Sequence, residues 1–237
     1  VDGRDGPMSL LRAGTASQTF NGDPGRSTVD QIDWGYYYIL APTATATAAN
    51  ASVARAAFAK AGPLPPVDSV QPRAVDEGWP VLAVAHSFGT LDDEGDTFTL
   101  LLGYDDVASM EFFGDRMTPY FRRGNSSADP EVSAELMTGL MSSALASAGD
   151  YASQCDAFDA GLFDELSRAG GEKYAELGSL AYRQVTGATK LVWNDKLGKP
   201  YLFIKEISSD GDVSTVDVLF PAAPMLMYHS PEMMRSA

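Results

Sequence analysis

Three consecutive helical segments, separated only by glycine-containing breaks, restrict what this chain can fold into. They cover residues 130–148, 151–169 and 172–192. In the first segment Val132, Leu136 and Leu140 recur every four residues, which places them on one helical face. Gly149 and Gly170 begin the two breaks, and such short connections favour helices that stack as antiparallel hairpins. We expect these helices to form an open layer. Ordinary monomers do not leave such an apolar face exposed, so the apolar side of this layer needs a cover.

The residues before this tandem have the pattern of strands and turns. An aromatic and β-branched run at 31–40 predicts a strand, and the Ala-rich run 52–60 predicts a short helix. The apolar runs 80–88 and 97–104 flank the turn sequence Asp92–Gly95, so we expect them to pair as an antiparallel hairpin. This part of the chain therefore has the pattern of a β-sandwich or of its edge.

The residues after the tandem predict two more strands and a last helix. The strand-like runs are 200–206 and 213–220, on either side of the turn signal Ser208–Gly211. Residues 221–237 begin another helix. The expected fold class is α+β, with a β-sandwich portion over residues 1–106 and a mainly helical portion over 107–237.

The charge balance excludes several classes of partner. Lys and Arg number 17 against 32 Asp and Glu, which gives a formal net charge of −15. Nucleic acids and anionic membrane faces need clustered cations, so neither is an expected partner. No apolar run approaches the roughly 18 residues of a membrane span, and we expect a water-soluble chain.

The few cysteine and histidine residues argue against a metal centre. Cys155, His86 and His229 cannot complete a zinc site of Cys and His ligands, and we expect neither a metal ion nor a cofactor. Two acceptor sequons, at Asn50 and Asn125, suit a glycosylated, secreted chain. The polar first seven residues contain no apolar signal-peptide core and no initiating Met, so we expect a processed or excised piece.

A strand that ends in Ala-His-Ser-Phe-Gly89 is similar to the nucleophile elbow of some lipases. Ser87, Asp217 and His229 even follow the chain order of that triad. An elbow needs a helix directly after its serine, and turn-forming residues follow Ser87, so a triad is not favoured. At the junction of the two portions, Asp105 and Asp106 are expected to cap the next helix.

A second group of polar residues is denser and lies in otherwise apolar segments. It consists of Tyr182, Arg183, Lys205, Glu206, Ser208, Ser209, Asp210 and Asp217. Polar groups in apolar segments are unfavourable unless they pair or carry out chemistry. The residues alone favour a salt-bridge network of Arg183, Lys205, Glu206 and Asp217, with a catalytic site as the alternative.

Several motifs give the chain a family resemblance. The C-terminal ones are GGEKYAEL (170–177), LAYRQ (180–184), FIKEISSDG (203–211) and STVDVLFPAAP (214–224). Upstream, QIDWG (31–35), FAKAG (58–62), RAV (73–75), WPV (79–81) and LGYDD (102–106) follow in the same order. Together they resemble the secreted fungal glutaminases of the glutaminase A type and their bacterial relatives. Asp210 stands where family members commonly have Asn, and Gly187 interrupts a helix that is usually more regular.

The resemblance implies a β-sandwich joined to an (α/α)6 six-hairpin toroid that hydrolyses L-glutamine to L-glutamate and ammonia. Family members are more than twice this length, so it also implies companion fragments of the same precursor and a secreted or cell-wall location. The chain would hold the end of the sandwich and part of the toroid.

The roles expected for the residues follow from the needs of amide hydrolysis. Arg183 or Lys205 would hold the substrate α-carboxylate, and Glu206 or Asp217 would bind the ammonium group or act as general base. The remaining candidates for substrate binding are Tyr182, Ser208, Ser209 and Asp210. A glycoside hydrolase on a six-hairpin toroid, or a non-catalytic scaffold subunit, is the alternative.

Overall fold

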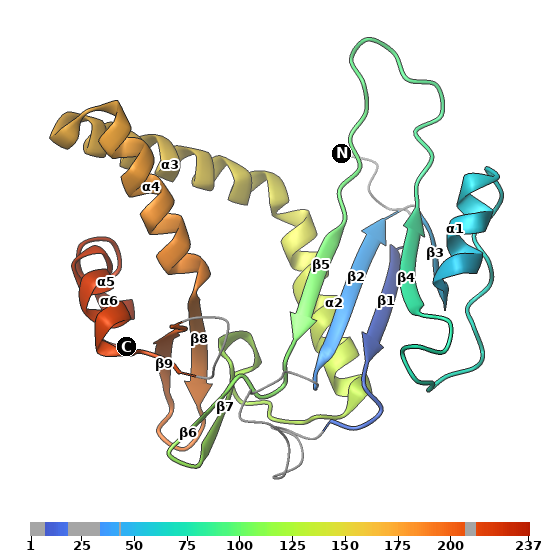
Figure 1. Cartoon of the computed structure of the whole chain (residues 1–237), viewed down its shortest axis with the longest axis horizontal. Helices are drawn as coiled ribbons and strands as arrows, with labels where there is room; N and C mark the ends of the chain where they lie inside the picture. The colour runs from blue at the N-terminus through green and yellow to red at the C-terminus, as the bar shows by residue number, and fades with distance from the viewer. Residues whose placement is uncertain (1–7, 19–33, 43, 207–211) are drawn as a thin grey trace. The chain divides into compact units, whose positions relative to one another are not determined.

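The computed structural model describes residues 8–18, 34–42, 44–206 and 212–237, which form two compact units (Figure 1). Unit 1 contains the described residues of 1–18, 34–105 and 128–146. Unit 2 contains the described residues of 106–127 and 147–237. The second block of unit 1 ends at Asp105, and residues 128–146 form its third block.

Unit 1 is built on two small antiparallel sheets. Its elements are β1 (Met8–Gly14), β2 (Tyr36–Pro42), β3 (Thr45–Asn50), α1 (Ala51–Ala59), β4 (Pro80–Ala85), β5 (Leu101–Asp105) and α2 (Pro130–Ala146). One sheet has the order β1-β2-β5 and the other pairs β3 with β4. In the central strand β2, Tyr36, Tyr38 and Leu40 are buried while Tyr37 is exposed, the two-residue period of a strand with one covered face.

The strand pairing corrects the expected hairpin of 80–88 with 97–104. Strand β4 pairs with β3 and strand β5 pairs with β2. The turn itself is present, because the Gly95 N–H donates to the Asp92 carbonyl oxygen over 3.2 Å. Strand β3 belongs to an Ala-rich stretch that has no strand signature, so the partner of β4 was not visible in the local pattern. The helix expected at 52–60 is confirmed as α1.

Helix α2 packs on the sheet of unit 1. Met137 and Met141 are buried against Gly103 of β5, where an added Cβ would lie 2.7 Å from the Met137 Cε atom. A glycine in β5 therefore lets the helix approach the strand closely. The expected tandem stack of three helices is wrong for α2, because this helix buries its apolar face on strands.

Unit 2 combines a four-stranded antiparallel sheet with helices. Its strands are β6 (Met110–Phe112), β7 (Asp115–Pro119), β8 (Thr189–Asn194) and β9 (Lys199–Ile204), in the order β6-β7-β8-β9. Its helices are the 3-10 helix η1 (Tyr120–Arg122), α3 (Ala148–Gly170), α4 (Glu172–Gly187), α5 (Val216–His229) and α6 (Pro231–Met234). Helices α3 and α4 form the expected hairpin across Gly171.

Two predictions for unit 2 need correction. The helix expected over residues 172–192 ends at Gly187. The last residues of the expected range belong to β8 instead. The strand expected at 213–220 is largely helical, because α5 begins at Val216. Val218, Leu219, Ala222, Met225 and Leu226 have helical spacing and all pack in one core. The β-branched start of α5 and its two prolines concealed that period. No described helix is long and apolar enough to cross a membrane.

Candidate functional site

The elements that carry the predicted polar cluster pack around one core in unit 2. The buried centre of this core consists of Leu202 and Ile204 from β9 and Ala222 and Leu226 from α5. Val185 near the end of α4 packs against the same centre. The structure thus brings together the three elements that the motif spacing singled out, α4, β9 and the N-terminal part of α5.

The charged side chains of this cluster lie at its surface. Arg183 is exposed on α4, so its guanidinium is not enclosed by the apolar residues of its segment. Asp217 is exposed in the first turn of α5, where a negative charge suits the positive end of the helix dipole. Neither side chain makes an ion pair with any described residue, so the expected salt-bridge network does not form through Arg183 and Asp217.

The end of β9 is held beside the start of α5 by backbone hydrogen bonds. The N–H of Lys205 donates to the Ala188 carbonyl oxygen over 2.9 Å, and that of Ser214 donates to the Ile204 carbonyl oxygen over 2.7 Å. Lys205 is exposed and Glu206 is half-buried. The three remaining predicted residues of the turn, Ser208, Ser209 and Asp210, lie outside the described residues.

An apolar groove of about 290 Å³ lies between α3, α4 and α5. Its lining consists of Leu162, Leu166, Gly178, Ala181, Tyr182, Val185, Pro221, Ala222, Met225, Tyr228 and His229. Tyr182 is the only residue of the predicted site among them. None of these lining residues is Lys or Arg and most of them are apolar, so the groove suits an apolar group.

Tyr182 belongs to an aromatic cluster at this groove. The centroid of its ring lies 5.2 Å from that of Phe158 and 5.3 Å from that of His229. Burial, and next the negative charge of Asp159, raise the pKa of Tyr182. Sequence reasoning did not pair His229 with Tyr182, since a strand was expected where α5 begins and the helical phase of α5 was therefore missing.

Unit 1 contains a buried polar cluster where α2 meets the sheet. Ser133 donates a hydrogen bond to the Asp105 carboxylate, which leaves the Tyr38 hydroxyl to donate to Ser133 over 2.7 Å. All three side chains are at most 1% exposed. Burial, the largest influence, raises the pKa of Tyr38. Because these side chains are closed to solvent, a substrate cannot reach them, and the role of the cluster is to anchor α2 on the sheet.

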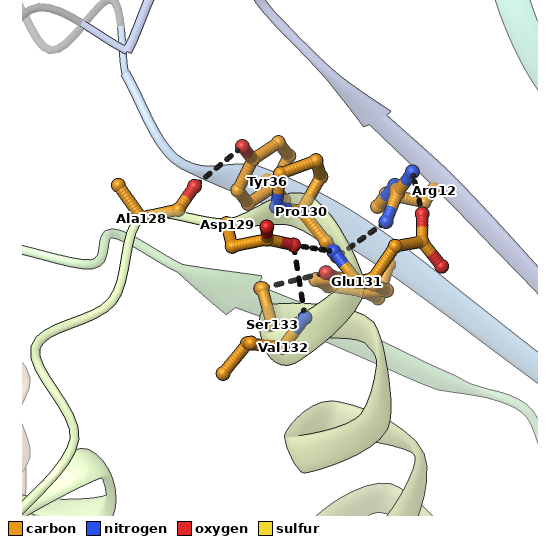
Figure 2. Close-up of polar contacts among 9 residues, drawn as sticks. Arg12, Tyr36, Ala128, Asp129, Pro130, Glu131, Val132 and Ser133 are labelled. Atoms are coloured by element: carbon orange, nitrogen blue, oxygen red, sulfur yellow. Dashed lines mark hydrogen bonds and ion pairs between the residues drawn. The ribbon is translucent and has the colours of Figure 1, made fainter.

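Figure 2 shows the first turn of α2, in which Asp129 and not Asp105 is the cap. The Asp129 carboxylate accepts hydrogen bonds from the N–H groups of Glu131 and Val132, at 2.8 and 3.4 Å. Arg12 of β1 pairs with the Glu131 carboxylate at 3.2 Å and donates to the Pro130 carbonyl oxygen. The expectation that Asp105 and Asp106 cap this helix is therefore wrong.

Other buried polar groups are also structural in character. Asp106 pairs with Lys190 of β8 at 2.7 Å.

The part of the chain that the structure describes does not contain the other kinds of site that were considered. Residues 86–100 form no helix after Ser87, so the helix that a lipase elbow requires is absent there, as expected. Among the described residues, no three His, Cys, Asp or Glu side chains gather as a metal site would require. Asn50 caps α1, and Asn125 lies in the loop between η1 and α2.

Comparison with protein families divides the chain in two. Residues 4–165 match a domain of unknown function, DUF5127, and residues 171–237 match the glutaminase A six helical-hairpin domain. The second match begins at the turn between α3 and α4 and contains Tyr182, Arg183, Lys205, Glu206 and Asp217. No solved structure matches the chain.

Two curated fungal proteins are similar along most of the chain. Glutaminase A of Aspergillus oryzae is 31% identical over 87% of this chain and 29% of its own length. A probable glutaminase of Arthroderma benhamiae is 32% identical over 85% of this chain and 24% of its own length. The chain thus spans less than a third of either relative. With motifs, domain matches and relatives in agreement, the chain belongs to the glutaminase A family.

Proposed function

We propose that the full-length protein to which this chain belongs is an L-glutamine amidohydrolase, which releases L-glutamate and ammonia. The observation that carries this proposal is the similarity to glutaminase A along 87% of the chain. A second observation supports it: the polar residues of the family-like motifs come from three elements that share one core. Arg183, which makes no ion pair with a described residue, and the exposed Asp217 both belong to these elements.

The proposed roles follow from charge and exposure. Arg183 is exposed and has no ion pair with a described residue, so its guanidinium is available to bind the substrate α-carboxylate through two parallel hydrogen bonds. Lys205 would add positive charge, and Glu206 or Asp217 would bind the α-ammonium group or activate water. Ser208, Ser209 and Asp210 would donate or accept hydrogen bonds at the amide. Tyr182 would close the apolar side of the site.

The finer architecture is also a proposal. The two sheets of unit 1 would belong to a β-sandwich, and the helices of unit 2 to an (α/α)6 toroid. The apolar groove between α3, α4 and α5 would be covered by companion segments of the same precursor, whether continuous with this chain or separated from it by proteolysis. A secreted or cell-wall location would suit the two sequons.

The decisive experiment measures ammonia release from L-glutamine by the full-length protein, with reducing-sugar release from glycans as the comparison. Glutamine turnover without sugar release is expected. A folded full-length protein that releases sugar, or that is inactive on glutamine, would overturn the proposal.

Arg183→Ala tests the site itself. We expect kcat/KM for glutamine to fall roughly tenfold to hundredfold, the effect of losing a charge-assisted hydrogen-bond pair, while the unfolding midpoint is unchanged. Arg168→Ala is the matched control, because Arg168 is an exposed helical arginine whose pair with Asp164 contributes little. Equal activity of the two variants would remove Arg183 from the proposed site.

A further inference from the structure

The two glycosylation sequons lie in different surroundings, although their sequences are nearly the same. Asn50-Ala-Ser52 spans the junction of β3 and α1, and Asn125-Ser-Ser127 lies in the loop after η1. In the first sequon Ala51 is buried, and its N–H donates to the Trp79 carbonyl oxygen over 2.9 Å. The serines of both sequons are exposed and both asparagines are half-buried, so the difference lies in the contacts that the two asparagines make.

Asn50 uses both ends of its side-chain amide within the fold. Its Oδ1 atom accepts hydrogen bonds from the N–H groups of Ser52 and Val53, at 2.9 and 3.3 Å, and thereby caps α1. Its Nδ2 atom faces Gly78 so closely that a Cβ added there would lie 2.2 Å away. Gly78 has a φ of +81°, so this backbone also favours glycine. A sugar attached to Nδ2 would need the space that Gly78 occupies.

Asn125 has a different local structure. Its Oδ1 atom accepts a hydrogen bond from the Ser127 N–H over 3.1 Å, which folds the sequon into an Asx turn. The buried Arg122 guanidinium stabilises this turn, because it donates hydrogen bonds to the carbonyl oxygens of Ser127 and Asn125 at 2.7 and 3.3 Å. Among the described residues, none of the hydrogen bonds that shape this turn involves the Nδ2 atom of Asn125.

We propose that Asn125 is the N-glycosylation site of this chain and that Asn50 remains unmodified. In the transfer, Nδ2 of Asn125 forms a bond to the anomeric carbon of a lipid-linked oligosaccharide and loses one proton. The bond from that carbon to the pyrophosphate oxygen breaks, and the polyprenyl pyrophosphate leaves. Asn50 acts instead as a structural cap, whose modification is incompatible with the packing at Gly78.

The test is peptide mass mapping of the full-length protein, secreted from a yeast host. An amidase that removes N-glycans leaves Asp in place of each Asn that carried one. We expect this conversion at Asn125 and an unchanged Asn at position 50. A glycan on Asn50, or none on Asn125, would overturn the proposal. The readout does not use glutamine turnover, so its failure is distinct from failure of the proposed activity.

Three variants sharpen the test. The Asn125→Gln variant is expected to lose one glycan, seen as a faster band on a denaturing gel. The Asn50→Gln variant is expected to keep the glycan on Asn125 and to have a lower midpoint of thermal unfolding. Gly95→Asn places an acceptor two residues before Thr97 in an exposed turn, where the φ of +71° is one that Asn tolerates. It is the positive control for modification of exposed loops. A glycan on this variant at position 95 and none on Asn125 would refute the selectivity argued from the structure.

Discussion

Single buried side chains decide how α2 is attached in unit 1. Ser133, Asp105 and Tyr38 are each at most 1% exposed and share two hydrogen bonds. A buried carboxylate needs hydrogen-bond donors, so the Ser133 hydroxyl, which donates to Asp105, has a larger effect on stability than its size suggests. The sequence singled out Asp105 but not the other two members of this cluster. Ser133 lies 28 residues further along the chain, and Tyr38, which bonds to Ser133, lies on another strand.

Ser133→Ala should therefore lower the free energy of unfolding by about 1–3 kcal/mol, because Asp105 loses one hydrogen-bond donor and Tyr38 loses the hydroxyl to which it donates. Urea unfolding followed by circular dichroism measures the change. Ser143→Ala, at an exposed position of the same helix, is the control and should stay within about 0.5 kcal/mol of the parent. Equal midpoints for the two variants would show that the buried cluster is energetically unimportant.

Helix α5 shows how a whole element depends on its packing partner. Its first residues are β-branched and it contains Pro221 and Pro224, both unfavourable for a helix by local preference. Its apolar residues nevertheless have helical spacing and face β9 in a shared core. The burial of that face outweighs the local preference, as tertiary contacts often do.

Two neighbouring residues of α5 make this measurable. Leu226 is 2% exposed and Met227 is 56% exposed. Leu226→Ala should destabilise the protein by about 2–5 kcal/mol through lost burial and the cavity left behind, while Met227→Ala should have a small effect. Thermal unfolding of both variants is the measurement. A larger loss for Met227→Ala would contradict the orientation of α5.

On the scale of the whole chain, the exposed apolar residues of unit 2 are the main feature. Leu177 is 68% exposed and Phe220 is 78% exposed, and the apolar groove lies on the same helices. Exposed apolar area of this kind marks an interaction surface or a tendency to associate. The chain spans less than a third of its two fungal relatives, whose remaining residues offer a cover.

We therefore expect the isolated 237-residue chain to associate in solution, with a mass above the 25.2 kDa of one copy, and the full-length protein to remain a defined particle. Light scattering of both proteins at equal concentration is the measurement. A monodisperse 25.2 kDa species that binds no apolar dye would show that the helical face needs no cover.

Local patterns were sufficient for the helices with an unbroken apolar period and for the turn at Asp92–Gly95. The helix at 51–59 and the α3–α4 hairpin follow from residues close together in the chain, and motifs along the chain were enough for the family. Strand partners could not be predicted from local patterns. Strand β4 pairs with β3 and β5 with β2, because a strand's hydrogen bonds are completed by segments far away in sequence.

The candidate site was also only partly predictable. Its residue types were visible in the motifs, whereas the exposure of Arg183 and the meeting of Tyr182 with His229 arose only when α4 and α5 packed together, since burial and contact are properties of the packed chain.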